Sequence, residues 1–502
     1  MSAQDLRIYN GQALAVREIP RLPFEAFRSL AQEETQGGAR VVSFWGYPEN
    51  GSLVLMMVLA HDKEGYLKPF STVVKDRYAS LTIEMPQVHW FEREIFEQWG
   101  TRPEGHPWLK PIRFHAPWKK AGGQLKAEDI TPSDMNFLKI SGEEIHEVAV
   151  GPVHAGIIEP GHFRFQCHGE QVFHLEISLG YQHRGIEKAL MGGPDKRAIH
   201  YIETAAGDTT VGHTLAYCQA IEGLSGCEVP LRASMLRAIM LELERLANHT
   251  GDLGAMAGDV GYLPTSSYCG RLRGDFLNLT ALICGNRFGR TMIRPGGVLF
   301  DVDDALIQEL KRRLVRIFAE VKNAVSLIWD SSLVIDRFDE TGVVEPKTAV
   351  DLGLVGVAAR ACGIERDVRF DFPTGAFQFS QVPVSTCVSG DVFGRAFVRW
   401  LEMQKSVDFI LDQLNNLPAG KIRGVVPPVR HDHMVVSLVE GWRGEICHTA
   451  LSGRDGSFAR YKIVDPSFHN WIGLAMAMRG EEISDFPLCN KSFNLSYCGH
   501  DL

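Results

Sequence analysis

The sequence has 502 residues, of which 45% are hydrophobic and 23% charged, so it has an ordinary globular composition and enough length for two or three domains. Its formal net charge of −9 argues against nucleic acid as a partner. It contains no run of about 18 apolar residues and no basic segment leading into an apolar stretch, so we expect neither a membrane span nor a secretory signal. The ten cysteines follow no spacing typical of a disulfide framework, and we expect free thiols in the cytoplasm.

Residues 1–115 have the pattern of a small α+β domain. Helical spacing in residues 23–34 precedes two β-type runs, 41–46 and 53–60, and the Gly/Pro/Asn segment between these runs predicts a hairpin turn. Residues 89–99 carry apolar side chains at helical spacing and are followed by Gly100, which predicts a helix that ends there. Residues 116–140 lack strong periodicity and are predicted to form a linker.

Residues 141–502 are predicted to form a second, mainly helical domain. It begins with an alternating run at 171–177, so we expect a β-hairpin region at its start. Three long stretches then carry an apolar stripe at helical spacing: 232–253, 303–329 and 392–414. For amphipathic helices of this length, packing into the core is favoured over a partner surface.

Titratable groups concentrate in one short segment early in the second domain. His183, Arg184 and Glu187 lie within five residues, and His183 and Glu187 share a face if the segment is helical. Alone, such a cluster is typical of a solvated surface. The segment His431-Asp432-His433 has metal-binding side chains but no evident third ligand, so a solvated loop is the preferred interpretation.

Several motifs follow one another in a recognisable order. Gly151-Pro152-Val153-His154 is followed by Tyr181-Gln182-His183-Arg184-Gly185-Ile186-Glu187-Lys188, later by Glu440-Gly441-Trp442-Arg443-Gly444-Glu445, and then by Asp465-Pro466-Ser467-Phe468-His469-Asn470. This collinear set resembles the large subunit of energy-converting (group 4) NiFe hydrogenases of the formate hydrogenlyase type. The first block, with Glu92-Arg93-Glu94 and Gly105-His106-Pro107-Trp108-Leu109, resembles the C subunit of NADH:quinone oxidoreductase (complex I).

The resemblance implies an α+β fold class with two unequal parts. A complex I C-subunit-like α+β domain over 1–115 would be joined, through the linker 116–140, to a mainly α-helical domain over 141–502. The second domain would be like the hydrogenase large subunit and the complex I D subunit, so the whole chain would match a fused C/D subunit.

The chain differs from the hydrogenases in the residues that hold the metal. In that family four cysteines, in two Cys-x-x-Cys pairs, hold nickel and iron, and this chain contains no such pair. By the resemblance, the four positions are Ala206, Thr209, Asn494 and Tyr497. Nickel and iron at such a site need soft thiolate ligands, so we expect the chain to bind no metal and to have no hydrogenase activity of its own.

Two cysteine-free branches of the family fit this pattern. One is the complex I D subunit, whose former metal cavity holds the quinone headgroup, and the other is the large subunit of hydrogenase-related complexes. The long spacing between His154 and His162, together with Gly207 and His213, favours the second branch. We therefore expect an oxidoreductase subunit that couples electron transfer to ion translocation, and the alternative is a non-catalytic, structural or conformational coupling subunit.

The resemblance also implies a set of site residues. We expect Glu187, His154, His183 and Arg184 to form a proton relay, with a raised pKa for Glu187 because of partial burial. We expect the emptied cavity to bind a quinone or another acceptor, and its candidate residues are Asp208, Thr209, His213, Asn494 and Tyr497. The competing interpretation is that these side chains fill a pocket without function.

The resemblance implies partner subunits that carry the redox groups and the membrane anchor. The expected partners are a small subunit with an iron–sulfur cluster, a ferredoxin-like subunit, a helical membrane subunit and antiporter-like subunits. NAD and quinone binding are expectations for such an assembly, and no cofactor is expected on this chain. The chain would then be peripheral, held by its partners at the cytoplasmic face of the cell membrane.

Overall fold

The computed structural model of the chain describes residues 6–118, 136–156 and 158–502. The predicted linker, 116–140, lies for the most part outside the described residues. Most of the chain on either side of it forms one extensive hydrophobic core, to which both predicted domains contribute.

The N-terminal part is a four-stranded sheet with two helices packed against it. The strand order is β2-β5-β4-β3, with β2 parallel to β5 and the other pairs antiparallel. The predicted hairpin is confirmed: its turn is Asn50-Gly51, and both residues have the positive φ that this turn requires, 48° and 79°. The elements are β2 (Arg21–Leu22), α1 (Phe24–Gln36), β3 (Arg40–Glu49), β4 (Ser52–His61), β5 (Tyr66–Val74), β6 (Arg77–Ala79), α2 (His89–Trp99) and β7 (Arg102–Glu104).

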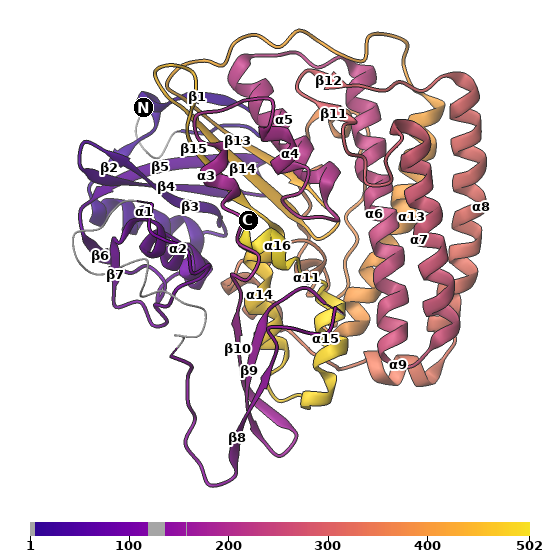
Figure 1. Ribbon diagram of the computed structural model, residues 1–502, viewed down its shortest axis with the longest axis horizontal. Coiled ribbons are helices and arrows are strands. Elements are labelled where there is room, and N and C mark those ends of the chain that lie inside the picture. The colour runs from indigo at the N-terminus through magenta and orange to yellow at the C-terminus, as the bar shows by residue number, and fades with distance from the viewer. Residues whose placement is uncertain (1–5, 119–135, 157) are drawn as a thin grey trace.

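The first strand belongs to a different sheet. Strand β1 (Ala13–Ala15) pairs with β13 (His433–Glu440), so that Ala13 lies opposite Val435. The sheet order is β1-β13-β14-β15, where β14 spans Glu445–Ser452 and β15 spans Phe458–Val464. This pairing anchors the N-terminal part directly to the C-terminal sheet, and β1 and β13 lie together in the upper left of Figure 1.

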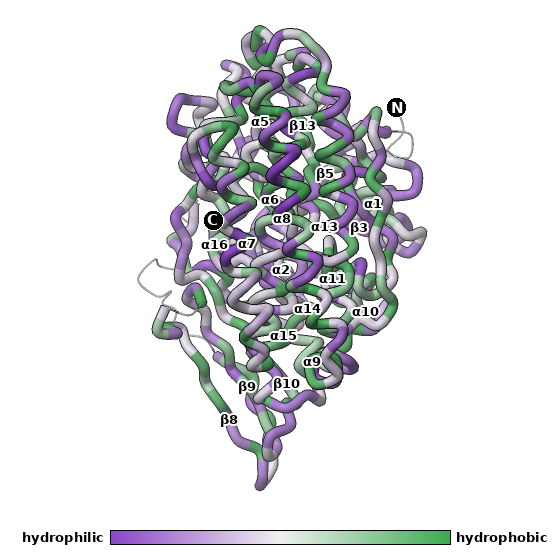
Figure 2. The backbone as a smooth tube through the Cα atoms, turned by 90° about the vertical axis from the view of Figure 1, so that its right-hand side faces the viewer, coloured by the Kyte–Doolittle hydropathy of each residue, from purple (hydrophilic) through white to green (hydrophobic). Residues whose placement is uncertain are grey.

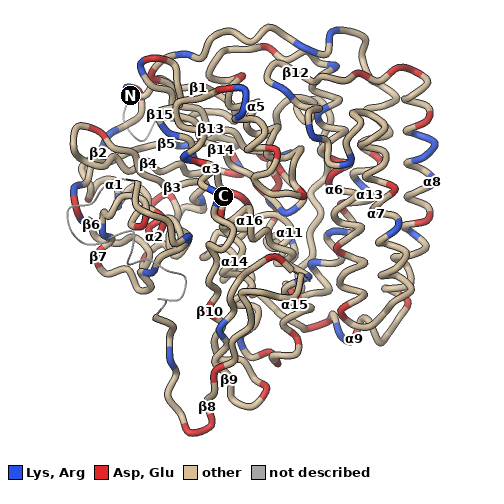
Figure 3. The backbone as a smooth tube through the Cα atoms, in the orientation of Figure 1, with Lys and Arg blue, Asp and Glu red and all other residues tan. Residues whose placement is uncertain are grey.

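Long helices form the side of the molecule opposite the N-terminal sheet (Figure 1). They are α6 (Leu231–Asp259), α7 (Leu263–Cys284), α8 (Asp304–Trp329) and α13 (Val392–Asn415). Three of them confirm the predicted stretches. Helices α8 and α13 are each preceded by an aspartate, Asp303 and Asp391, whose side chain accepts a backbone N–H of the first turn. Charges of both signs occur along α8 in Figure 3, as expected for a helix with one solvated face.

A three-stranded antiparallel sheet projects from the body of the molecule. Its order is β10-β9-β8, with β8 at Ile145–Val150, β9 at His162–His168 and β10 at Gln171–Ser178. Figures 1 and 2 both show this sheet extending away from the helices, and it confirms the expected β region at the start of the second domain.

Short elements connect the helices to the sheets. Helix α5 packs on β13 and β14, and the three last helices follow β15. The remaining elements are α3 (Ile186–Leu190), α4 (Ala198–Ile202), α5 (Thr210–Ser225), β11 (Ile293–Arg294), β12 (Gly297–Val298), α9 (Ser332–Phe338), α10 (Pro346–Asp351), α11 (Gly356–Arg360), α12 (Val368–Asp371), α14 (Pro466–Ala477), α15 (Phe486–Phe493) and α16 (Tyr497–Asp501).

Among the residues that the structure describes, no helix is both long enough and apolar enough to cross a membrane.

Candidate functional site

Arg443 joins the two segments in which the sequence predicts the emptied metal site. It lies in the turn between β13 and β14, and its guanidinium donates to both carboxylate oxygens of Asp208, at 2.6 and 2.7 Å. One of its nitrogens also donates to the hydroxyl of Thr209 at 3.2 Å, and its Nε donates to the carbonyl oxygen of Asn494. The side chain is almost fully buried, at 6% exposed.

Further bonds hold this group in place. Trp442 donates its ring N–H to Thr209 at 3.1 Å, and the Arg443 guanidinium lies over the Trp442 ring. The Asn494 side chain donates to Asp252 at 2.5 Å, and Asp252 also pairs with Arg399. Asn494 ends α15 with a φ of 45°, a left-handed conformation that asparagine tolerates better than most residues. We call Arg443, Asp208, Thr209, Asn494 and Asp252 the Arg443 site.

The Arg443–Asp208 pair determines the charge of the site. Burial alone would raise the pKa of Asp208, but the Arg443 guanidinium outweighs burial and holds that pKa below its ordinary value. Asp208 is therefore ionised at neutral pH, and the pair presents a fixed, bidentate ion pair rather than two mobile charges.

A second polar cluster begins at His213. Its Nε2 lies 2.9 Å from Asp465 and its Nδ1 lies 3.0 Å from His448, whose other ring nitrogen is 2.9 Å from the hydroxyl of Tyr461. All four side chains are buried. Burial lowers the pKa of His448 well below its usual range, with His213 adding to the effect, so His448 is neutral. Asp465 connects the two clusters: burial alone would raise its pKa, but the hydrogen bond to His213 and, to a smaller extent, the charge of Arg443 lower it.

The structure contradicts the raised pKa that we predicted for Glu187. This side chain is 3% exposed, and it accepts from Arg460 at 2.9 Å, from Lys462 at 3.0 Å and from the backbone N–H of Ile463 at 3.0 Å. Burial by itself would raise the pKa, but the two cations, with Arg113, hold it far below its ordinary value. The prediction considered burial alone and missed cations that lie more than 270 residues away in sequence.

The other predicted relay residues hold backbone segments together. His183 contacts the carbonyl oxygen of Asp501 at 2.8 Å, and burial lowers its pKa to about 4. Arg184 donates to the carbonyl oxygens of Ala205 and Cys498, at 2.9 and 3.1 Å, so it bridges the same two segments as Arg443. His154 contacts the carbonyl oxygen of Gly161 at 2.8 Å, within the loop that leads to β9.

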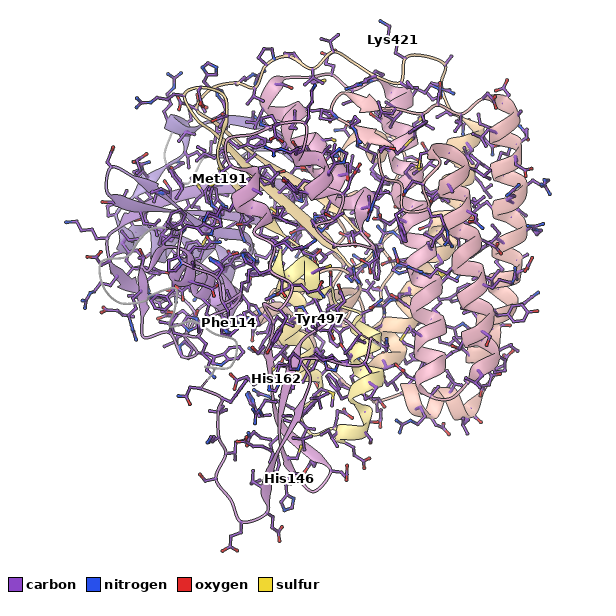
Figure 4. The ribbon with its side chains drawn as sticks, in the orientation of Figure 1. Phe114, His146, His162, Met191, Lys421 and Tyr497 are labelled. Carbon is purple, nitrogen blue, oxygen red and sulfur yellow. The ribbon has the colours of Figure 1, made fainter. Side chains whose placement is uncertain are left out.

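Tyr497 lies in the apolar wall beside the site. Its ring packs edge-on against Trp471, with 4.8 Å between centroids, and its hydroxyl accepts from Asn490 at 3.3 Å. Figure 4 shows Tyr497 near the upper end of the projecting sheet, above His162. Asp208, Thr209 and Asn494 are thus brought together around Arg443, His213 reaches this group through Asp465, and Tyr497 has no hydrogen bond to Arg443 among the described contacts.

The donor set around Arg443 does not suit a nickel–iron centre. Ala206 has no donor atom, the Thr209 hydroxyl is bonded to Arg443 and Trp442, and the guanidinium brings a positive charge between the two segments. Cys498 is the nearest thiol in sequence, and burial raises its pKa to about 11, so it is not a thiolate at neutral pH. Within the described part of the chain, no group of three His, Cys, Asp or Glu side chains is arranged to hold a metal ion.

Sequence reasoning missed the residues at the centre of the site. Arg443 and Asp465 stand in motifs that carried the resemblance, but the motifs alone indicate no role for either. Asp252, His448 and Tyr461 stand in no motif that the sequence brings out. The available signal was an arginine between a tryptophan and a glycine, Trp442-Arg443-Gly444, inside one of the resemblance motifs, because a buried cation needs a carboxylate partner.

Comparison with known proteins agrees with this architecture. The family model of the 30-kDa subunit of respiratory-chain NADH dehydrogenase matches residues 24–126, and that of the 49-kDa subunit matches residues 259–433. NADH-quinone oxidoreductase subunit 4 of Thermus thermophilus is 31% identical over 384 residues, which cover 71% of this chain and 93% of the relative.

Hydrogenase subunits are similar over a comparable length. Formate hydrogenlyase subunit 5 of Escherichia coli is 28% identical over 440 residues, covering 84% of this chain and 76% of the relative.

The C/D subunit of the NADH-quinone oxidoreductase of Bdellovibrio bacteriovorus is 28% identical over 447 residues, covering 81% of this chain and 80% of the relative. The chain therefore belongs to the family of the 49-kDa subunit of respiratory NADH dehydrogenase and the related large subunits of group 4 hydrogenases, and it carries a 30-kDa-subunit domain at its N-terminus.

Proposed function

We propose that this chain is the large subunit of a membrane-associated oxidoreductase complex, and that its Arg443 site binds the polar group of an electron acceptor such as a quinone. The observation that carries the proposal is the convergence of residues 208–209 and 494 on one buried guanidinium. Relatives of this chain are named as subunits of NADH-quinone oxidoreductase and of formate hydrogenlyase, and both names denote redox enzymes. Because the residue at this convergence, Arg443, is a cation, the site favours an acceptor that becomes negatively charged when it is reduced.

The chemistry follows from the donors that are present. A carbonyl oxygen that takes up electrons becomes negatively charged, and a guanidinium fixed in a buried site stabilises that charge without reorganising at the moment of reaction. Asp208 and the Thr209 hydroxyl both accept hydrogen bonds from Arg443 and keep its guanidinium in position before the acceptor binds. The His213–Asp465 pair provides a hydrogen-bonded route for protons behind the site.

Partner subunits would deliver the electrons. We place neither an iron–sulfur cluster, nor nickel and iron, nor NAD on this chain, because the described side chains around Arg443 offer no thiolate set. The implied partners are an iron–sulfur small subunit, a ferredoxin-like subunit, a helical membrane subunit and antiporter-like subunits. These partners would hold the chain at the membrane surface.

Substitution of Arg443 tests the acceptor site. Arg443→Lys keeps the charge but loses the two-pronged contact, and Arg443→Gln loses both. We expect kcat for acceptor reduction by the assembled complex to fall by roughly 10²–10³-fold in Arg443→Gln, as for a lost oxyanion donor, and by less in Arg443→Lys. The exposed Arg454 provides the control as Arg454→Gln. Full activity of an assembled Arg443→Gln complex would refute the acceptor site.

A buried ionic network favours the second candidate function, conformational coupling. Three arginines, Arg245, Arg360 and Arg369, contact four carboxylates: Glu242, Glu402, Glu440 and Asp367. Burial, with the charge of Asp367, raises the pKa of Glu440 to about 7, so this network gains or loses a proton near neutral pH. If coupling is the function, Glu440→Gln abolishes ion translocation, while Arg443→Gln leaves it unchanged.

A further inference from the structure

Glu244 is a buried carboxylate that shares a pocket with Asp208. It lies on α6 and is 9% exposed, and its two oxygens accept from the backbone N–H groups of Val211, at 2.7 Å, and Gly212, at 3.1 Å. These N–H groups belong to the first turn of α5, which begins directly after the Asp208–Thr209 segment. Glu244 is therefore fixed against the backbone of the Arg443 site.

The pocket beside Glu244 is lined by residues of α5, α6 and α7 and of the segment that follows α7. Its volume is about 10 Å³, which is close to the minimum for a single water molecule. Two arginines line it: Arg273, on α7, is half-buried, and Arg287, after α7, is exposed, so the pocket borders the surface at Arg287. The full lining is Asp208, Val211, Glu244, Asn248, Arg273, Leu277, Thr280, Arg287 and Phe288.

The surroundings of Glu244 differ from those of the acids nearby. Asp208 pairs with Arg443 and Asp252 pairs with Arg399, whereas Glu244 forms no ion pair with any described residue. The charged groups that face it are Asp208, Arg245 and the two arginines of the pocket. Burial raises the pKa of Glu244 to about 8. The hydrogen bonds from the backbone of Val211 and Gly212 lower this pKa, and the negative charge of Asp208 offsets part of that lowering.

The alternative role for Glu244 is purely structural. A carboxylate at the start of α5 satisfies two backbone donors and faces the positive end of the helix dipole. That role needs an acceptor oxygen but no titrating proton. Glu244→Gln keeps one acceptor oxygen and nearly the same shape, so it separates the two roles.

We propose that Glu244 is the acid–base group that exchanges protons between solvent and the Arg443 site, through the pocket lined by Arg273 and Arg287. A solvent proton enters the pocket, its bond to water breaks, and an O–H bond forms at a carboxylate oxygen of Glu244. The O–H bond at Glu244 then breaks, an O–H bond forms at the oxygen of the reduced acceptor in the Arg443 site, and Glu244 returns to the carboxylate. When the two carbonyl groups of a quinone take up two electrons from the iron–sulfur small subunit, they also take up two protons. Two such proton transfers therefore balance the charge of the two electrons.

The direct test follows the carboxyl group itself. Infrared spectra of the purified full-length chain, recorded between pH 6 and 10, should show a protonated-carboxyl band that is lost with an apparent pKa near 8. The band should be missing in Glu244→Gln. The matched control is Asp259→Asn, because Asp259 lies on the same helix, about 22 Å along its axis, and burial raises its pKa to about 6. A band near pH 8 that persists in Glu244→Gln overturns the proposal.

A second test uses turnover of the assembled complex. This part rests on the proposed acceptor site. Glu244→Gln should lower kcat by roughly 10²–10⁴-fold and remove the pH dependence near 8, while Glu244→Asp keeps part of the activity and Asp259→Asn keeps all of it. Arg273→Gln should raise the pKa that the infrared band reports, because a positive charge no longer favours the carboxylate.

The two tests separate the proposals. If the band titrates as expected but the wild-type complex reduces no acceptor, the acceptor site fails and Glu244 remains a titrating group. If the complex is active and Glu244→Gln retains both rate and pH profile, Glu244 is a structural cap and the proton-exchange role is wrong.

Discussion

Replacing Glu187 with glutamine should destabilise the protein rather than abolish a proton relay. Glu187 and Glu94 are the two carboxylates of a buried cluster that also contains Arg113, Arg460 and Lys462. Glu94 and Arg113 come from the N-terminal part, whereas Glu187 and both β15 cations come from the second domain. In Glu187→Gln, three buried cations are left with a single carboxylate.

The loss of unfolding free energy in Glu187→Gln can be estimated from the burial of Glu187 and its cationic partners. Glu187 is 3% exposed in its side chain, Arg460 is 1% and Lys462 is 0%, so solvent does not screen the lost charge. Removing one member of a buried ion pair costs about 3–5 kcal/mol of unfolding free energy. The pKa of Glu187 lies below its ordinary value of 4.5, so this stabilisation is fully present above pH 4.5 and is lost as the pH falls below it.

Thermal unfolding, followed by tryptophan fluorescence, measures the effect. A chain of this length has an unfolding entropy of about 1 kcal/mol per kelvin, so a loss of this size should lower the Tm by about 3–5 °C at pH 7. The difference from wild type should shrink below about pH 4. Glu147→Gln is the control: Glu147 pairs with Arg164 at the surface, where the side chains are 33% and 25% exposed, and it should change the Tm by about 1 °C or less. A Glu187→Gln variant as stable as this control, with lost turnover, would refute the structural role and restore the relay.

Three further outcomes are expected. Elemental analysis of the purified chain should find no stoichiometric nickel, since the residues around Arg443 supply no thiolate set; one nickel per chain would contradict the donor argument. Gly212→Ala should lower stability by about 1–3 kcal/mol in denaturant unfolding, because a Cβ there would lie 2.7 Å from Ile446 and 3.2 Å from Thr209, and an unchanged midpoint would show that Ile446 yields freely. Iodoacetamide at pH 8 should leave Cys498 unmodified in the folded chain, because it is buried and its pKa is raised to about 11, and rapid labelling at that position would show that the segment opens.

The long helices could be predicted where pattern and caps agree. The apolar stripe of α8 and the aspartate before it indicate both the type and the start of the element. Helix α7 was missed because its polar residues and glycines, such as Gly270 and Gly274, interrupt the stripe. The strands β13 to β15 were missed because they are buried on both faces and therefore lack the alternation that identifies a half-exposed strand.

The candidate site could be predicted only as far as single segments. Asp208, Thr209 and Asn494 were located by the resemblance, but their common partner is 235 residues from Asp208. A sequence motif shows that an arginine is present, and it does not show which carboxylate the arginine meets. The roles of Arg443 and Asp465 therefore depended on the three-dimensional structure.

Two glutamates show why the sign of a pKa shift needs the structure. Glu187 and Glu244 both lie on helices, and both are buried. Burial pushes both pKa values upward, and the difference comes from what each carboxylate faces. Glu187 meets Arg460 and Lys462 and is held ionised, whereas Glu244 meets two backbone N–H groups and the negative Asp208, and its pKa rises to about 8. The group suited to exchange protons at neutral pH is thus the one without a cationic partner, and long-range contacts decide which glutamate that is.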